Sequence, residues 1–134
     1  MKLHHIGIAV NDISITWNIL KALFDIKENP EPFLDQKQKV NEVHFRLGDI
    51  LIQLVEPTSE NSPISNFLKA RGGGLHHLCF EVDDIEAVIN HYKKNNIRIL
   101  YEPFQGAFGH RYAFISPDDT ARVLIEFVEK RRKI

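Results

Sequence analysis

The chain has 134 residues, a length that suits one compact domain with its own hydrophobic core. Its formal net charge is −1 and charges of both signs are interspersed, so nothing predicts binding to nucleic acid or to an anionic membrane. The single cysteine, Cys79, excludes an internal disulfide, and the N-terminus lacks the long apolar run of a secretory signal, so we expect a cytoplasmic protein.

The first half of the chain predicts a strand, a helix and then further strands. The run His4–Val10 alternates like a strand, and Asn11-Asp12 after it is a helix N-cap signal. One apolar helix face follows at spacings of four, three and four: Ile13, Trp17, Leu20 and Phe24. Residues 27–39 are too polar to predict an element, and the next predicted strands are Val40–Leu47 and Ile50–Val55.

The second half repeats this order after a short connecting helix. Ser62-Pro63 begins that helix, and Gly72 to Gly74 provide a flexible link behind it. The strand-like run LHHLCFEV comes next, followed by the cap Asp83-Asp84 and a second amphipathic helix, which Asn95-Asn96 can end in a left-handed turn. The apolar stripe of this helix is Ile85, Val88, Ile89 and Tyr92. The strands predicted after it are Ile97–Tyr101, Tyr112–Ile115 and Val123–Val128.

Corresponding residues of the two halves lie a nearly constant distance apart in the sequence. His77 follows His5 by 72 residues, and Glu126 in LIEFVE follows Gln53 in LIQLVE by 73 residues. We therefore predict two homologous modules within one domain, which covers residues 1–134: about 1–60 and about 72–134.

Four polar residues occupy strand positions where apolar residues are expected. Because side chains alternate along a strand, His5 shares a face with Gly7 and Ala9, and His77 takes the equivalent place in the second module. Gln53 and Glu126 are each the only polar residue of an apolar run, and burying such a group without a partner is costly. A lone histidine or glutamine in such a position is usually a structural residue whose hydrogen bonds are made to other protein groups or to water. Two matched pairs, however, favour a shared site for a divalent ion such as Zn, Ni, Co, Mn or Fe, and the mixed nitrogen and oxygen ligands are unlike those of a closed structural zinc site.

Over nearly its whole length the chain resembles the vicinal oxygen chelate superfamily of glyoxalases, bleomycin-resistance proteins and dioxygenases. Within it the motifs are most similar to those of the methylmalonyl-CoA epimerase family: HHIGIAVNDI, LIQLVEP, SENSPISNFL, RGGGLHHLCFEVDDI and VLIEFVE. The resemblance implies an α+β fold in which two βαβββ modules form a curved mixed sheet around a metal site. It also implies a homodimer, an acyl-CoA or thioester substrate and one divalent ion per chain (Co, Zn, Ni or Mn). The implied ligands are His5, Gln53, His77 and Glu126, and the first histidines of the pairs, His4 and His76, point to the opposite face with structural roles.

The epimerase resemblance further implies a second carboxylate on the strand before the glutamine-bearing one, where this chain has Glu42 in VNEVHF. A solvent-exposed glutamate is the alternative, because VNEVHFRL alternates like any half-exposed strand. Two late motifs depart from the family pattern. The chain has GAFG, with Phe108, where the family has GAHG, and SPDDTARVLIEF, with Asp118-Asp119, where the family has an HPKS-like stretch. Glycines on both sides of Phe108 indicate either an ordinary turn or a flap over the metal site at residues 104–112.

This site suits proton abstraction next to a carbonyl. We expect a metal-dependent epimerase in which Glu42 and Glu126 form the acid/base pair, with Glu126 also a ligand. A glyoxalase I type lactoylglutathione lyase, which uses the same metal chemistry, is the first alternative. An extradiol-type dioxygenase is a weaker one, because such enzymes use two histidines and one carboxylate and Gln53 would be an extra ligand. A metal-free protein that binds a small molecule such as an antibiotic is the last, and such proteins tend to lack the ligands that this chain keeps.

Overall fold

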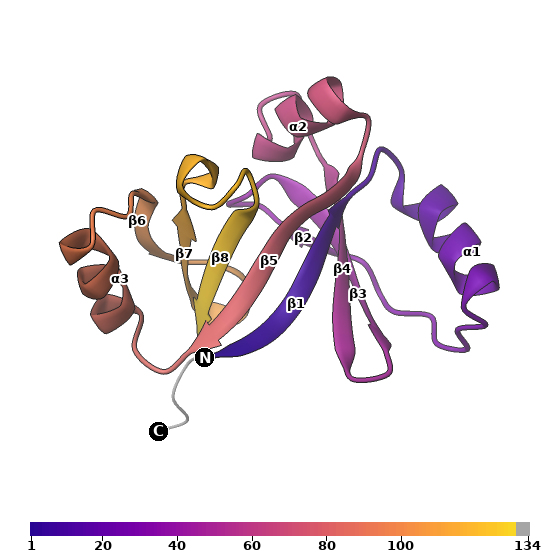
Figure 1. The fold of residues 1–134 in the computed structure, drawn as a ribbon. Coiled ribbons are helices and arrows are strands. Elements are labelled where there is room, and N and C mark those ends of the chain that lie inside the picture. Colours follow the sequence, from indigo (N-terminus) through magenta and orange to yellow (C-terminus); the bar gives the residue numbers. More distant parts are fainter. Residues whose placement is uncertain (131–134) are drawn as a thin grey trace. The chain divides into compact units, whose positions relative to one another are not determined.

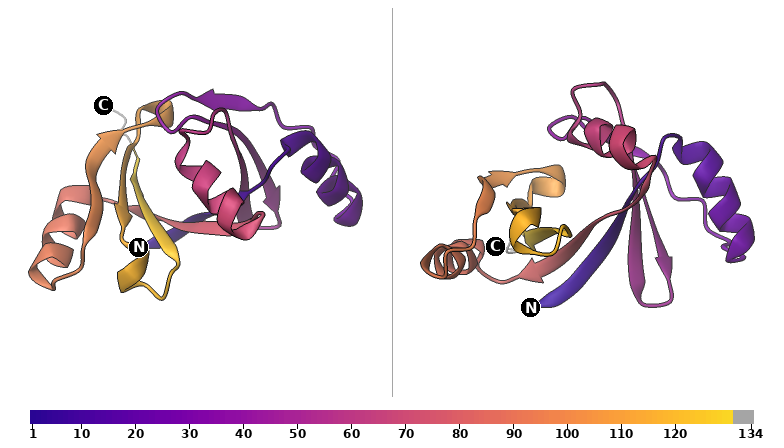
Figure 2. Two further views of the ribbon diagram at one scale, coloured as in Figure 1. Left: turned by 90° about the horizontal axis from the view of Figure 1, so that it is seen from above. Right: turned by 45° about the horizontal axis from the view of Figure 1, so that its top comes forward.

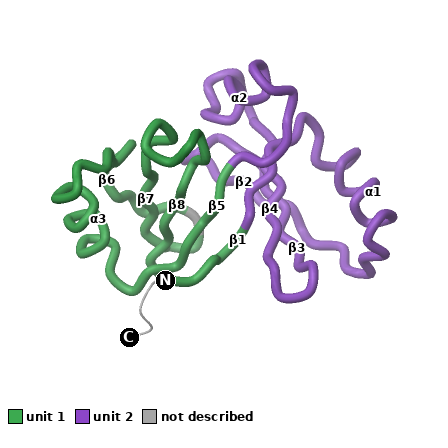
Figure 3. Tube along the Cα trace, viewed as in Figure 1, with its two compact units in different colours: residues 1–5, 77–134 green, residues 6–76 purple. Residues whose placement is uncertain are grey.

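The computed structural model describes residues 1–130, and the chain divides into two compact units (Figure 3). Unit 1 consists of Met1–His5 and the described part of His77–Ile134, and unit 2 is Ile6–His76. Strand β1 (Lys2–Ala9) therefore contributes residues to both units. No helix among the described residues is long and apolar enough to cross a membrane.

Unit 2 contains a four-stranded mixed sheet with helices against both faces (Figure 1). The strands β2 (Phe33–Asp35), β3 (Val40–Leu47) and β4 (Ile50–Pro57) follow in the order β2-β3-β4-β1, and β1 is parallel to β4 while the other neighbours are antiparallel. Helix α1 (Ile13–Leu23) covers one face, where its residues pack with Val43, Phe45, Ile52 and Leu54. Helix α2 (Pro63–Arg71) packs on the end of the other face, with Ala9, Val40 and Val55.

Unit 1 repeats this topology with the second module. Its sheet has the order β5-β8-β7-β6, and β5 is parallel to β8 while the other neighbours are antiparallel. The strands are β5 (Gly74–Val82), β6 (Ile99–Gln105), β7 (Arg111–Ile115) and β8 (Leu124–Glu129). Helix α3 (Ile85–Lys94) lies beside β6 in both views of Figure 2, and its apolar stripe packs on Ala113, Ile115 and Phe127. The predicted pair of βαβββ modules is thus confirmed, and the chain has the α+β, glyoxalase-like fold.

The two modules begin their helices in the same way. Asp12 caps α1 by accepting a hydrogen bond from the Ile15 amide at 3.0 Å, and Asp84 caps α3 through the Ala87 amide at 3.0 Å. A glutamate at the end of the last strand adds a second acceptor in each module. Glu56 Oε2 accepts from the first amide of α1, that of Ile13, at 2.7 Å, and Glu129 Oε2 accepts from the first amide of α3, that of Ile85, at 2.6 Å. A carboxylate in this position also faces the positive end of the helix dipole, so these contacts stabilise the junction of helix and strand.

Apart from shifts of one or two residues at strand ends, the structure differs from the predicted elements in three places. Strand β2 lies within the polar segment for which no element was predicted, because its three residues form a strand only by pairing with β3. Strand β6 continues beyond the predicted Tyr101 and contains Pro103. A proline is tolerated there because β6 is the outer strand of its unit and has register shifts. Helix α1 ends before Phe24, which is 49% exposed and does not join the predicted buried stripe.

Candidate metal centre

Three of the predicted ligands come together in unit 1. His5 on β1, His77 on β5 and Glu126 on β8 have exposed fractions of only 4%, 7% and 4%. The Nε2 atoms of the two histidines are 3.0 Å apart, and Glu126 Oε2 lies 3.1 Å from His77 Nε2 and 3.8 Å from His5 Nε2. Strand alternation brings them to one face, because residues such as Gly7 and Cys79, two positions further along β1 and β5, are also buried.

The spacing of these three atoms suits a single divalent ion. Protein nitrogen and oxygen ligands bind such ions at about 2.0–2.2 Å, so two ligands lie about 3.0 Å apart at a right angle and about 3.4 Å apart at a tetrahedral angle. The distances between the donor atoms bracket these values, and all three atoms lie within 4.8 Å of one another. The cluster of two imidazoles and one carboxylate can therefore hold a metal ion of intermediate softness.

A second group in the described residues also has the composition of a metal site: His4, His5 and Cys79. Metal binding there would require the thiolate of Cys79. Burial raises the pKa of the Cys79 thiol far above its usual value, and the nearby carboxylates Glu126 and Glu81 raise the pKa further. Cys79 itself has no exposed surface and packs with Tyr112 and Val128 as a core residue, so we take the group with Glu126 as the candidate metal site.

The other two predicted site residues, Glu42 and Gln53, meet in unit 2. Glu42 is 4% exposed and is not the solvated glutamate of the alternative interpretation. Its Oε2 accepts hydrogen bonds from Gln53 Nε2 at 2.9 Å and from His44 Nε2 at 3.0 Å. The ring of His44 stands edge-on to Phe33, with 5.0 Å between the ring centroids. This network is built by the pairing of β3 with β4, in which His44 lies opposite Gln53.

The hydrogen bond to Glu42 fixes the orientation of the Gln53 amide. Because Nε2 must donate to the carboxylate, Oε1 faces the other way. Among the described residues, Gln53 Oε1 is the one buried side-chain polar atom without a hydrogen-bond partner. A buried carbonyl oxygen is costly to leave without a donor or a cation, so this atom has the property expected of a metal ligand.

Two contacts were missed from the sequence. His44 follows Glu42 by two residues, so strand alternation alone would have placed the two side chains on one face. The ring of His4 was expected to lie on the face of the sheet opposite His5, with a structural role only. Its Nδ1 nevertheless lies 2.8 Å from Nδ1 of His5. His76 does have a packing role, because its ring stands edge-on to Phe67 of α2, with 4.8 Å between the centroids. Burial, together with the Arg71 guanidinium, lowers the His76 pKa to about 4.

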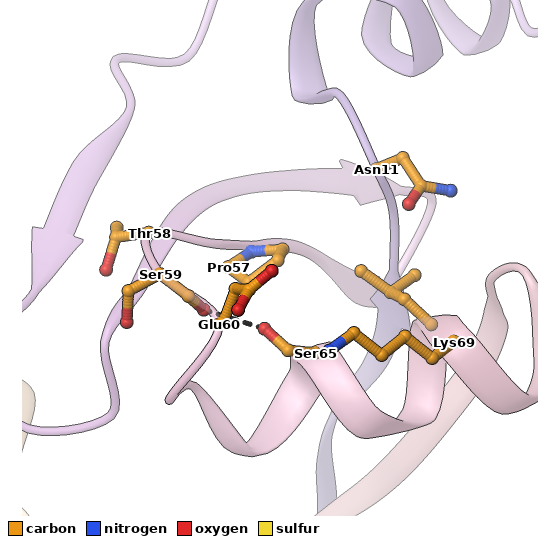
Figure 4. A pocket seen from close by; sticks show the side chains of 8 residues that line it. Asn11, Pro57, Thr58, Ser59, Glu60, Ser65 and Lys69 are labelled. Atoms are coloured by element: carbon orange, nitrogen blue, oxygen red, sulfur yellow. Dashed lines mark hydrogen bonds between the residues drawn. The ribbon is translucent and has the colours of Figure 1, made fainter.

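Each unit also has a surface pocket away from these groups. In unit 2 a hollow of about 360 Å³ lies between the end of β4 and α2 (Figure 4). One of its hydroxyl groups has a local partner, since Ser65 Oγ donates to the Ser59 carbonyl at 2.7 Å. In unit 1 a hollow of about 380 Å³ lies beside the N-terminal end of α3. Neither contains the predicted site residues.

The acidic pair Asp118-Asp119, which departs from the family pattern, is partly neutralised within unit 1. Asp119 accepts from the Arg98 backbone amide at 2.8 Å and from the guanidinium at 2.9 and 3.2 Å, while Asp118 lies 3.9 Å from the same guanidinium. Hydrogen bonds from Arg98 lower the Asp119 pKa. The pair therefore joins the start of β6 to the turn before β8, and the positive charge of Arg98 compensates part of its negative charge.

The repeated module and the buried cluster of two histidines and one glutamate define the class of protein. A family model of the glyoxalase/bleomycin resistance protein/dioxygenase superfamily matches residues 4–114, and the chain belongs to this superfamily. The resemblance inferred from the motifs is thus confirmed.

The relatives narrow the class to one kind of isomerase. The chain is 35% identical over 131 residues to the mitochondrial methylmalonyl-CoA epimerase of Dictyostelium discoideum, covering 96% of this chain and 78% of that protein. It is also 35% identical over 132 residues to the ethylmalonyl-CoA/methylmalonyl-CoA epimerase of Cereibacter sphaeroides, covering 93% and 95%. A solved structure of a Streptomyces coelicolor methylmalonyl-CoA epimerase variant in complex with 2-nitronate-propionyl-CoA has a TM-score of 0.89 at 30% identity, covering 98% of this chain and 99% of that one.

Proposed function

We propose that this chain is a metal-dependent epimerase that inverts the alpha carbon of methylmalonyl-CoA. The observation that carries the proposal is the buried cluster of His5, His77 and Glu126, whose donor atoms are spaced for one ion. The similarity to epimerases of methylmalonyl-CoA over nearly the full chain supports the substrate. A relative with a bound propionyl-CoA analogue supports an acyl-CoA thioester as the ligand class.

The proposed ligands are His5, His77, Glu126 and Gln53. The first three are supported by their mutual distances, and Gln53 is supported by its buried oxygen without a hydrogen-bond partner and by its match to Glu126 in the internal repeat. Co, Zn, Ni and Mn all suit a site of two imidazoles and two oxygens. A bound ion would supply Lewis-acid stabilisation for the negative charge that develops on the thioester carbonyl.

Inversion requires one group to remove the alpha proton and another to return a proton to the opposite side. We assign these roles to the carboxylates of Glu42 and Glu126. Both hydrogen bonds that Glu42 accepts from described residues fall on Oε2, so we assign the proton transfer to its Oε1. His44 and Gln53 hold Glu42 in one orientation, which general acid/base catalysis needs.

Two further proposals concern the state of the protein. We propose a homodimer, because α1 exposes an apolar stripe at spacings of four, with Ile15, Ile19 and Leu23 between 61% and 68% exposed. Light scattering at micromolar concentration tests this, and a monomer there would contradict it. We also propose a cytoplasmic location, because the only cysteine is free and buried.

The test of the proposed function is the interconversion of the two methylmalonyl-CoA epimers by purified protein. We expect inversion that is lost with a chelator and regained with Co²⁺ or Zn²⁺. The hemithioacetal of methylglyoxal and glutathione serves as the competing substrate. Turnover of that compound without epimerisation would favour a lyase of the same fold and would refute the proposal.

A further inference from the structure

His4 and His76 occupy the same place in the two modules but have different neighbours. Each precedes a proposed metal ligand by one residue, and the two are 72 residues apart. In unit 1 the His4 ring stands edge-on to that of His5, with the Nδ1 atoms 2.8 Å apart and the ring planes at 75°. In unit 2 the His76 ring stands edge-on to Phe67 instead, with the planes at 89°.

The geometry of His5 decides which nitrogen carries its proton when it binds a metal. His5 Nε2 faces His77 Nε2 at 3.0 Å and Glu126 Oε2 at 3.8 Å, so Nε2 is the nitrogen directed toward the cluster. A histidine binds a metal through an unprotonated nitrogen, so a neutral His5 that ligates through Nε2 carries its proton on Nδ1. The Nδ1 atoms of His4 and His5 are 2.8 Å apart, which is within the hydrogen-bond range. His4 Nδ1 is therefore placed to accept a hydrogen bond from His5 Nδ1–H.

We propose that His4 is a positioning residue of the metal centre: its Nδ1 accepts the hydrogen bond of His5 Nδ1–H and so fixes the tautomer and the ring orientation of His5. The inference rests on the proposed metal-dependent function. Metal-binding histidines usually donate their second N–H to a carboxylate, a carbonyl or water, and removal of that partner typically lowers metal affinity about 10–100-fold. In this chain an adjacent imidazole would perform the same task.

A competing explanation of the contact is that His4 and His5 bind a metal together with Cys79, whose donor atoms also lie within 4.8 Å of one another. In that arrangement each of the two histidines would supply one ring nitrogen as a ligand, and the thiol would have to ionise. The two explanations differ in the role of Cys79, which is a ligand in one and a buried apolar residue in the other.

The experiment measures Zn²⁺ and Co²⁺ affinity by competition with a chelating dye, without substrate, for the wild type and four variants. His4→Phe keeps a ring but has no acceptor, whereas His4→Asn keeps an oxygen close to the position of Nδ1. His76→Phe is the matched control in the second module, and Cys79→Ala tests the competing site. We expect a loss of about 10–100-fold for His4→Phe. We expect His4→Asn, His76→Phe and Cys79→Ala to stay within about threefold of the wild type, as their ligands and the acceptor remain.

Affinity of His4→Phe within threefold of the wild type, an equal loss in His76→Phe, or a large loss in Cys79→Ala would overturn the inference. Nitrogen-15 NMR of the zinc-loaded wild type provides a test that needs no variant. His5 should carry its proton on Nδ1 and His4 on Nε2, and a proton on His4 Nδ1 would refute the proposal. A wild type that binds no divalent ion would instead refute the metal-dependent function itself, so the two failures are distinguishable.

Discussion

Replacing Glu42 with glutamine removes a carboxylate from unit 2 and leaves the shape of the side chain nearly unchanged. The introduced amide keeps one oxygen that can accept from Gln53 Nε2, as Glu42 Oε2 does now at 2.9 Å. Hydrogen bonds to charged groups contribute about 1.5–3 kcal/mol, and neutral ones about 0.5–1.5 kcal/mol. Glu42→Gln weakens the two hydrogen bonds from His44 and Gln53. The resulting loss of stability is offset in part, because the variant no longer buries a charged carboxylate. We therefore expect the free energy of unfolding to fall by no more than about 2 kcal/mol.

The effect on catalysis should be much larger than the effect on stability. If Glu42 is one of two proton-transfer groups, Glu42→Gln should lower the epimerisation rate by about 10²–10⁴-fold. That range corresponds to about 2.7–5.4 kcal/mol in the activation barrier. Metal content should remain that of the wild type, because the introduced oxygen can still hold the Gln53 amide in its present orientation.

The assay combines steady-state epimerisation, metal analysis and proton exchange in D₂O. Glu126 remains in the variant, so the alpha proton of one epimer should still exchange with solvent deuterium without inversion. Glu60→Gln is the control, since it makes the same chemical change at an exposed residue of the same unit. Wild-type epimerisation by Glu42→Gln would refute the two-carboxylate mechanism and leave a reaction with one base.

Three further predictions concern other residues. Glu126→Gln should lose both the metal and all proton exchange, because it removes the proposed charged ligand from the buried cluster, and a variant that retains one ion per chain by elemental analysis would contradict this. The Cys79 thiol should not react with a thiol reagent at pH 8 until the protein unfolds. The pKa of this thiol is raised in the folded state, so above the ordinary thiol value of 9.0 Cys79 ionises only in the unfolded chain. The free energy of unfolding should therefore decline as the pH rises above 9.0, and urea unfolding at pH 8 and pH 10 tests the direction of this change. Phe108, which is 67% exposed with φ of 59°, should contact substrate if residues 104–112 form a flap, so Phe108→Ala should raise KM, and unchanged kinetic constants would contradict that role.

The sequence predicted the architecture because the signals that define it are local and occur twice. Asp12 and Asp84 cap their helices as expected, Asn96 adopts the left-handed conformation after α3, and β3 has the predicted bounds. Strand β2 could not be predicted, since three residues make a strand only through a partner that lies elsewhere in the chain. Long-range pairing decides such elements, and a periodicity search does not detect it.

The residues of the candidate site could be selected from the sequence, but the hydrogen-bond network around them could not. The repeat identified His5, His77 and Glu126, which come together as expected, whereas the burial of Glu42 could not be decided from an alternating strand. Alternation shows which residues share a face but not which face is covered. The Arg98 partner of the acidic pair lies some 20 residues earlier in the sequence, so its pairing with Asp119 could not be predicted from the sequence either.

The most direct test of the account is deuterium incorporation at the alpha carbon of methylmalonyl-CoA in D₂O, followed by proton NMR. Protein treated with a chelator and then dialysed should give no exchange above the background, and addition of one equivalent of Co²⁺ or Zn²⁺ should restore exchange together with interconversion of the epimers. Exchange at the same rate in metal-free protein, or none after each of Co²⁺, Zn²⁺, Ni²⁺ and Mn²⁺ has bound, would contradict a metal-dependent epimerase.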